Sequence, residues 1–194
     1  LCAESPDLRL LKQKYNPGDY AYARYSAGFG KGTAVLKCKS PVKVNELLDN
    51  VIIEYTADSS GIAPGGKLFV TVPPYCGMPQ TTDKNAPGFV SIDTCGAKYV
   101  TSFELLYFSR ANPGYSDPEH NRILCITFPQ GLAADSVVEI VYHNAQVTKY
   151  ARGWHGGKLR FLIHVDHDAD GWEEEIAESP WVPVRTGPIR KMSP

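Results

Sequence analysis

Three aspartates at alternate positions, Asp166, Asp168 and Asp170, precede Gly171 in the stretch HVDHDADG and could hold a cation. Calcium takes about six to eight hard oxygen ligands, and alternate acidic residues on a tight loop direct their carboxylates toward one centre. Glu175 is a nearby carboxylate that could complete the set. The pattern therefore predicts either a structural calcium site or a hairpin turn, since Asp and Gly are also the residues that tight turns require. We favour the turn and keep the calcium as the alternative.

The loop is not an EF-hand. Counting from Asp166, Ala177 stands at the twelfth position, where that motif places a bidentate glutamate. The segment KLRFLIHV before the loop reads as a strand, whereas an EF-hand loop lies between two helices.

Catalytic patterns are scarce. The chain has no HExxH zinc signature, no GxSxG nucleophile elbow and no phosphate-binding P-loop. His143 and His155 share a glycine-rich region without a nucleophile or carboxylate beside them in sequence. We therefore expect no catalysis, with a small carboxylate-dependent hydrolase as the last alternative.

Aromatic residues are the second lead. Tyr20, Tyr22 and Tyr25 lie in the alternating stretch DYAYARY, and Trp154 and His155 lie in the glycine-rich stretch RGWHGG. Aromatic rings combine a large apolar area with a polar edge, and they are common where proteins contact partners or sugars. These five residues are the predicted binding residues, for a protein partner or for a glycan.

Short strand-like runs separated by turn residues dominate the chain. Their regular spacing predicts an all-β antiparallel sandwich of about ten strands, immunoglobulin-like or jelly-roll-like. With 15 prolines and 17 glycines, no segment keeps a helical period over three turns. Only VNELLDN and EEEIAES read as short helical turns.

Three parts follow from this pattern: an N-terminal Tyr/Gly-rich arm or edge strand at 1–30, a sandwich domain at 31–186, and a tail or linker at 187–194. Two long aperiodic loops, 73–87 and 143–158, are the expected binding edge, because long loops in a compact domain are often functional. The arm could add to a neighbouring copy as an exchanged strand, giving a homo-oligomer.

Composition excludes several classes of protein. The net charge of −1 comes from 20 basic and 21 acidic residues, which is no footprint for nucleic acid. No apolar run reaches the roughly 18 residues of a membrane span. The first residues carry no signal-peptide pattern, so the compartment is unknown, and an extracellular or periplasmic location is favoured if a signal was removed.

The five cysteines cannot all pair internally, because their number is odd. Cys38 and Cys125 lie in apolar runs and are expected to be small buried hydrophobic residues. Cys76 and Cys95 flank a loop-rich stretch, where a disulfide is the less favoured of two alternatives.

A series of short landmarks follows one another along most of the chain from about residue 33. They are the turn residues Gly61, Ile62, Gly65 and Gly66, the pair Pro79 and Gln80, the strand start Pro87, Gly88 and Phe89, the hairpin VDHDADG, and the closing pairs Gly187–Pro188 and Ser193–Pro194. In this order they resemble the N-terminal β-rich region of a large uncharacterised bacterial family. In that family the region precedes a PHP-like metal-dependent hydrolase domain.

The resemblance implies an accessory domain without the hydrolase's metal ligands, since that domain would begin after a segment like the MSP at the end of the chain. The expected function is therefore a non-catalytic domain for protein association, by self-assembly or by docking to a hydrolase module. A carbohydrate-binding module that uses exposed Tyr and Trp is the alternative.

Overall fold

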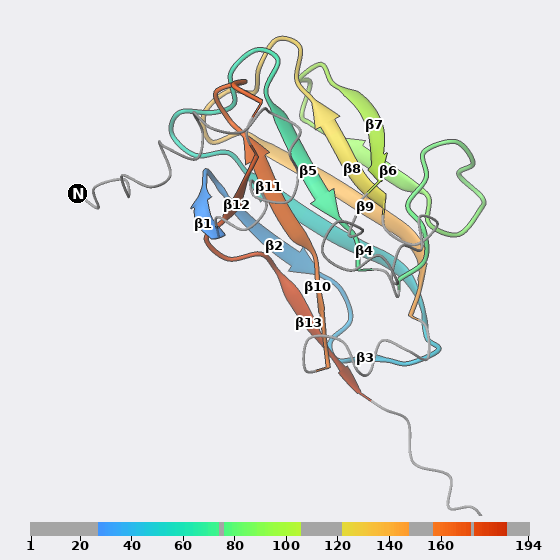
Figure 1. Cartoon of the computed structure of the whole chain (residues 1–194). Coiled ribbons are helices and arrows are strands. Elements are labelled where there is room, and N and C mark those ends of the chain that lie inside the picture. Colours follow the sequence, from blue (N-terminus) through green and yellow to red (C-terminus); the bar gives the residue numbers. More distant parts are fainter. Residues whose placement is uncertain (1–26, 74–75, 106–121, 148–156, 172, 186–194) are drawn as a thin grey trace, which may run out of the picture.

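The computed structural model describes residues 27–73, 76–105, 122–147, 157–171 and 173–185 (Figure 1). These residues form thirteen β-strands and no helix, so none of the described segments is a helix that could cross a membrane. The expected all-β class is confirmed, with more strands than the ten or so that the sequence indicated.

The strands follow the alternating and β-branched runs of the sequence. In chain order they are β1 Ala27–Gly30, β2 Thr33–Lys37, β3 Val42–Lys43, β4 Leu47–Thr56, β5 Lys67–Thr71, β6 Val90–Asp93, β7 Val100–Leu105, β8 Arg122–Thr127, β9 Val137–Gln146, β10 Lys158–Arg160, β11 Leu162–Asp166, β12 Glu174–Ile176 and β13 Trp181–Arg185.

Two larger sheets make the sandwich. One has six strands in the order β1-β12-β11-β5-β8-β7, and the other has four in the order β2-β4-β9-β6. A small third sheet, β10-β13-β3, extends one end. Pairing is antiparallel except between β1 and β12 and between β13 and β3, which are parallel.

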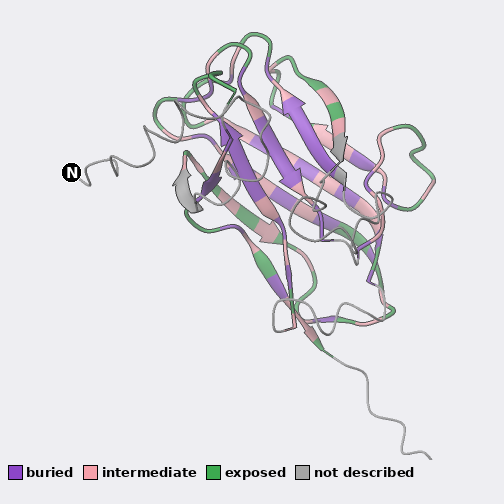
Figure 2. Ribbon diagram, viewed as in Figure 1, coloured by how far each residue is buried: buried purple, intermediate pink, exposed green. Residues whose placement is uncertain are grey.

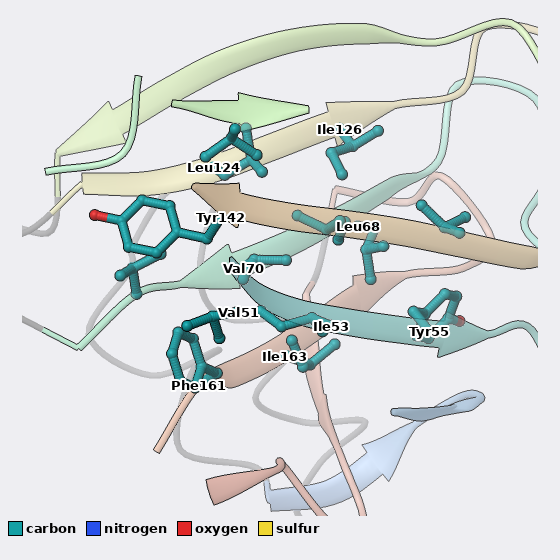
Figure 3. Close-up of a cluster of buried hydrophobic side chains, with 14 of the residues drawn as sticks. Val51, Ile53, Tyr55, Leu68, Val70, Leu124, Ile126, Tyr142, Phe161 and Ile163 are labelled. Atoms are coloured by element: carbon teal, nitrogen blue, oxygen red, sulfur yellow. The ribbon is translucent and has the colours of Figure 1, made fainter. Parts of the chain in front are cut away.

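The core lies between the two larger sheets (Figure 2). Buried positions alternate along β4 and β9 of the four-stranded sheet, whereas β5, β8 and β11 of the six-stranded sheet are buried at several consecutive positions. Side chains from both sheets meet in one apolar cluster, in which Tyr55 and Tyr142 are among the largest fully buried residues (Figure 3). Both tyrosine hydroxyls are satisfied: that of Tyr55 donates to the Lys31 carbonyl at 2.9 Å, and that of Tyr142 to the Cys76 carbonyl at 3.0 Å. Buried polar tips therefore add hydrogen bonds to the apolar packing, as buried tyrosines generally require.

The chain crosses between the sheets on both sides of the sandwich. β1 belongs to the six-stranded sheet and β2 to the four-stranded one, while β6 and β7 make the opposite crossing on the other side (Figure 1). Tyr99 fixes the second crossing, because its hydroxyl donates to the Ile92 carbonyl at 3.1 Å.

Three local expectations need correction. EEEIAES is not a helical turn, because Glu174–Ile176 pair with β11 and β1 as a strand. VNELLDN is not helical either, since β4 begins at Leu47. The run KLRFLIHV is two strands in two sheets, β10 and β11, because Phe161 turns its backbone N–H to the Pro180 carbonyl at 2.9 Å.

The four cysteines of the described residues form no disulfide with one another. Cys125 is buried in β8 as expected, and Cys38 is half-buried. Cys76 is buried and Cys95 is exposed, so the alternative of a disulfide between them is not seen.

Candidate functional site

The aspartate loop connects two antiparallel strands of the six-stranded sheet. β11 ends at Asp166, and β12 returns with His164 opposite Glu175 and Val165 opposite Glu174. The two strands thus form a hairpin, and the choice between a plain turn and a cation site concerns the loop that closes it.

Three carboxylates gather in that loop. Asp166, Asp168 and Asp170 each offer one oxygen atom, and these oxygens lie within 4.8 Å of one another. Asp168 and Asp170 are exposed, whereas Asp166 is only 3% exposed. Two ligand oxygens on opposite sides of one calcium ion lie about 4.6–5.2 Å apart, because each lies about 2.3–2.6 Å from the ion. The cluster therefore has the dimensions of a partial calcium shell.

Asp166 is in an unfavourable electrostatic environment for an anion. Its Oδ2 accepts a hydrogen bond from the Gly171 backbone N–H at 3.2 Å, while its Oδ1 is buried without a hydrogen-bond partner. Burial raises the pKa of this carboxyl above its ordinary value, and the nearby charges of Asp170 and Asp168 raise the pKa further. The hydrogen bond from Gly171 and the charge of Lys67 act in the opposite direction.

The loop rests on two other turns at the same end of the sandwich (Figure 1). In the turn between β4 and β5, the Ala63 N–H donates to the His167 carbonyl at 2.7 Å. Gly66 passes so close that an added Cβ would lie 2.6 Å from the Asp166 carbonyl oxygen. The backbone of the turn between β4 and β5 thus contacts the aspartate loop at Asp166 and His167, where the chain leaves β11.

A symmetric pair of bonds joins that turn to the one between β8 and β9. Ile62 and Leu132 each donate a backbone N–H to the other's carbonyl, at 2.9 and 2.8 Å, and both side chains are buried. Gly65 N–H donates to the Phe128 carbonyl at 2.8 Å. These backbone hydrogen bonds hold together the two turns against which the aspartate loop packs.

Glu175, predicted as a further calcium ligand, is not among the gathered carboxylates. Its Oε1 accepts a hydrogen bond from Arg160 Nη2 at 2.7 Å, and its side chain is 8% exposed. Glu175 lies on β12 opposite His164, which precedes the loop on β11. In this register the Glu175 side chain reaches Arg160 of β10 instead of the loop.

The predicted aromatic binding residues Tyr20, Tyr22, Tyr25, Trp154 and His155 lie outside the described residues. Most of the expected binding loop 143–158 also lies there, and its first residues belong to strand β9. The other expected loop, 73–87, is organised by Gln80. The side chain of Gln80 accepts hydrogen bonds from the Thr82 and Asp83 backbone N–H groups, both at 2.8 Å, and donates to the Asp83 carbonyl at 2.7 Å.

One polar pair was not foreseen from the sequence. Ser91 Oγ and His143 Nε2 lie 2.8 Å apart on the neighbouring strands β6 and β9, and the Phe89 ring stacks on the imidazole with centroids 5.6 Å apart. The two residues are 52 positions apart in the chain. Only the pairing of β6 with β9 brings them together, so no local pattern could have indicated the contact.

No protein-family model matches the chain, and no curated protein matches it by sequence. Among solved structures, the chain is similar to a cohesin module of a Clostridium perfringens family 33 glycoside hydrolase, with 10% identity, a TM-score of 0.40, and coverage of 81% of this chain and 99% of that one. It is also similar to AggA, the major subunit of an Escherichia coli aggregative adherence fimbria, with 9% identity, a TM-score of 0.30, and coverage of 83% and 99%. A third is the collagen-binding domain of a Staphylococcus aureus adhesin, with 13% identity, a TM-score of 0.28, and coverage of 70% and 87%. Similarity at this level does not extend to function.

Proposed function

We propose that this chain is a non-catalytic β-sandwich domain that associates with a second copy of itself by adding a strand to the edge strand β7. The observation that supports the proposal is that β7 is an edge strand with a regular backbone. β7 ends the six-stranded sheet, and within the described residues it pairs only with β8, over six consecutive positions without a register shift.

The first four residues of β7 lack the features that usually protect an edge strand. Val100 is 59% exposed, Ser102 is also exposed, and no charge occurs from Val100 to Phe103. Natural edge strands usually carry lysine, proline or a bulge, which prevent pairing with another chain. A regular edge strand whose first four residues carry no charge is suited to accept an extended segment through backbone hydrogen bonds.

The other edges of the larger sheets are less accessible or less suitable. β6 is bordered by Gln80, whose N–H donates to the Gly88 carbonyl at 2.9 Å and whose carbonyl accepts the Val90 N–H at 2.8 Å. β2 ends in Lys37, which pairs with Glu54. β1 has only four residues.

The occupant we propose is the alternating segment 19–25, DYAYARY, of a second copy. Its seven residues are enough to pair with the six of β7. Tyr20 and Tyr22, two positions apart, would place their rings on one face of the extended sheet. This assigns a role to the aromatic residues Tyr20 and Tyr22 without requiring a sugar ligand.

The test is the molar mass of the chain in solution, measured by light scattering over a range of concentrations. The wild type is expected to associate as its concentration rises. Deleting residues 1–26, or substituting Val100→Lys together with Ser102→Lys, is expected to leave a folded monomer. Val35→Lys is the matched control, because Val35 is 53% exposed on the edge strand β2.

A monomeric wild type at all concentrations, or unchanged association in both the deletion and the double lysine variant, would contradict the proposal. Loss of association in the Val35→Lys control as well would assign the contact to the other side of the sandwich. The lysine variants are at exposed positions, where substitutions usually change stability by less than about 0.5 kcal/mol.

A further inference from the structure

We propose that the loop between β11 and β12 binds one calcium ion through the carboxylates of Asp166, Asp168 and Asp170. This inference is independent of the proposed strand addition, because the loop and β7 are different parts of the six-stranded sheet. It rests on two observations: three carboxylate oxygens within 4.8 Å of one another, and a buried Asp166 oxygen without a partner.

The buried oxygen distinguishes this loop from an ordinary acidic turn. A turn that needs aspartates only for local hydrogen bonds leaves their other oxygens in water, as the exposure of Asp168 and Asp170 allows. Asp166 is 3% exposed, and one of its oxygens has neither water access nor a hydrogen bond. Burying an unpaired carboxylate oxygen is costly, and buried charges in proteins are paired or coordinate metals.

The neighbours of Asp166 increase this cost. Asp168 and Asp170 bring two more negative charges to the same place, and the pKa of Asp166 is raised by its burial and by both of them. A divalent cation bound by the three carboxylates would offset their mutual repulsion and the cost of burying the Asp166 carboxylate. Nothing else in the described part of the loop provides a compensating positive group at hydrogen-bond distance from Asp166 Oδ1.

The ligand chemistry favours calcium over other metals. All three ligands are hard carboxylate oxygens, and the gathered group contains neither histidine nor cysteine, which zinc and copper prefer. Magnesium requires a near-ideal octahedron at about 2.0–2.1 Å, whereas calcium accepts irregular shells in which water completes the coordination. The exposed side of the loop, at Asp168 and Asp170, leaves room for water ligands.

Strand pairing and a backbone hydrogen bond hold the start of the loop in place before the ion binds. Asp166 ends a strand that is paired with β5 over five positions, up to Asp166 opposite Lys67. The His167 carbonyl is fixed by the Ala63 N–H at 2.7 Å. Less chain entropy is therefore lost on binding than in a loop that must fold around the ion.

The experiment uses the full chain after dialysis against a chelator. Calcium chloride and magnesium chloride are titrated separately by calorimetry, and thermal unfolding is recorded with each salt and with the chelator. We expect one calcium per chain, with a weak Kd of about 10⁻⁴–10⁻³ M, and weaker binding of magnesium. Calcium is also expected to raise the Tm, since it binds the folded state.

Two variants and one control locate the site. Asp168→Asn combined with Asp170→Asn should weaken calcium binding by at least about tenfold, because two of the charged ligands become neutral. Asp166→Asn should abolish the calcium-dependent rise in Tm while the Tm in chelator stays equal to or above that of the wild type. Asp83→Asn is the matched control, because Asp83 is an exposed loop aspartate whose carboxylate accepts a backbone N–H from Asn85 at 2.9 Å.

The absence of calcium heat and of a calcium-dependent Tm shift in the wild type would overturn the proposal. So would a lower Tm of Asp166→Asn in chelator, since that result would mean that the charged carboxylate stabilises the loop without an ion. An equal loss of calcium binding in Asp83→Asn would move the binding site elsewhere.

Discussion

Arg160 donates a hydrogen bond from Nη2 to Oε1 of Glu175 across 2.7 Å, and this contact ties the small third sheet to the six-stranded one. The Glu175 side chain is 8% exposed, while that of Arg160 is 38% exposed. The carboxylate is thus the buried member of the pair. It lies on β12, the strand that closes the aspartate loop.

Arg160→Met should destabilise the fold by about 1–3 kcal/mol, because it leaves a buried carboxylate without its donor. Replacing both residues, by Arg160→Met with Glu175→Gln, should recover part of the loss. Denaturant unfolding measures both values. The matched control is Lys37→Met, which removes the more exposed Lys37–Glu54 pair and should cost less than about 1 kcal/mol. Equal losses in the two single variants would mean that burial of Glu175 has no energetic consequence.

Gly61→Ala should destabilise the base of the aspartate loop. Gly61 has a φ of 67°, and an added Cβ would lie 2.3 Å from the Leu132 carbonyl oxygen, which accepts the Ile62 N–H. Gly96→Ala is the control, since Gly96 also has a positive φ, of 101°, but an added Cβ there meets nothing within 4 Å. The control variant should be destabilised only by backbone strain, by about 1–3 kcal/mol. Thermal unfolding of both variants compares the two; a loss at Gly61 no larger than at Gly96 would show that the backbone yields easily there.

Acid should weaken the turn between β3 and β4 through Glu46. Hydrogen bonds from the Lys39 ammonium and then from the Lys43 backbone N–H lower the pKa of Glu46 below its ordinary 4.5. The folded state therefore binds the proton less tightly than the unfolded state, so this contribution is present above pH 4.5 and is lost as the pH falls below that value.

Glu46→Gln should consequently make the Tm less sensitive to pH in the range below 4.5, measured by unfolding at several pH values. Lys39→Met, which removes the main cause of the lowered pKa, should reproduce part of this change. Identical acid sensitivity in the wild type and in both variants would count against the assignment.

The cysteines should differ sharply in reactivity. Cys95 is exposed, whereas Cys76 is buried. Burial is the main cause that raises the pKa of the Cys76 thiol to about 12. Because the thiolate is the nucleophile, native protein treated with iodoacetamide should be modified at Cys95 and not at Cys76. Peptide mass spectrometry after labelling reads both sites separately. Labelling in denaturant should modify both, and early modification of Cys76 in the native state would indicate that the 76–88 loop opens.

The alternating runs were sufficient to predict the sandwich, because residues that alternate between core and solvent leave a period of two in the sequence. β4 and β9 show this most clearly, with Ile53 and Ile140 facing the core. The prediction that EEEIAES forms a helical turn was wrong, because a strand of three residues carries no detectable period. The pairing of this strand with β11 and β1 decides its conformation. The split of KLRFLIHV depends on one backbone bond from Phe161 to Pro180, which the local sequence does not encode.

The aspartate cluster could be predicted because its members are two residues apart on one loop. Glu175 does not lie in this group of three carboxylates, since its side chain accepts a hydrogen bond from Arg160, which lies 15 residues earlier. The contact of Ser91 with His143 could not be predicted from the sequence either, because it depends on which strands are neighbours. Spacing along the chain predicts sites within one loop, and it does not predict sites assembled across strands.

The small bridge that Gln80 makes beside β6 also limits how many partners the molecule can hold. By occupying backbone groups at Gly88 and Val90, it leaves one of the two sheets closed on that side of the sandwich. A domain with one accepting edge and one donated segment has a valence of two, with unlike ends. In the proposed association, copies would therefore form a directional chain, unless the rotation between neighbours closes it into a ring, of which a reciprocal exchange between two copies is the smallest.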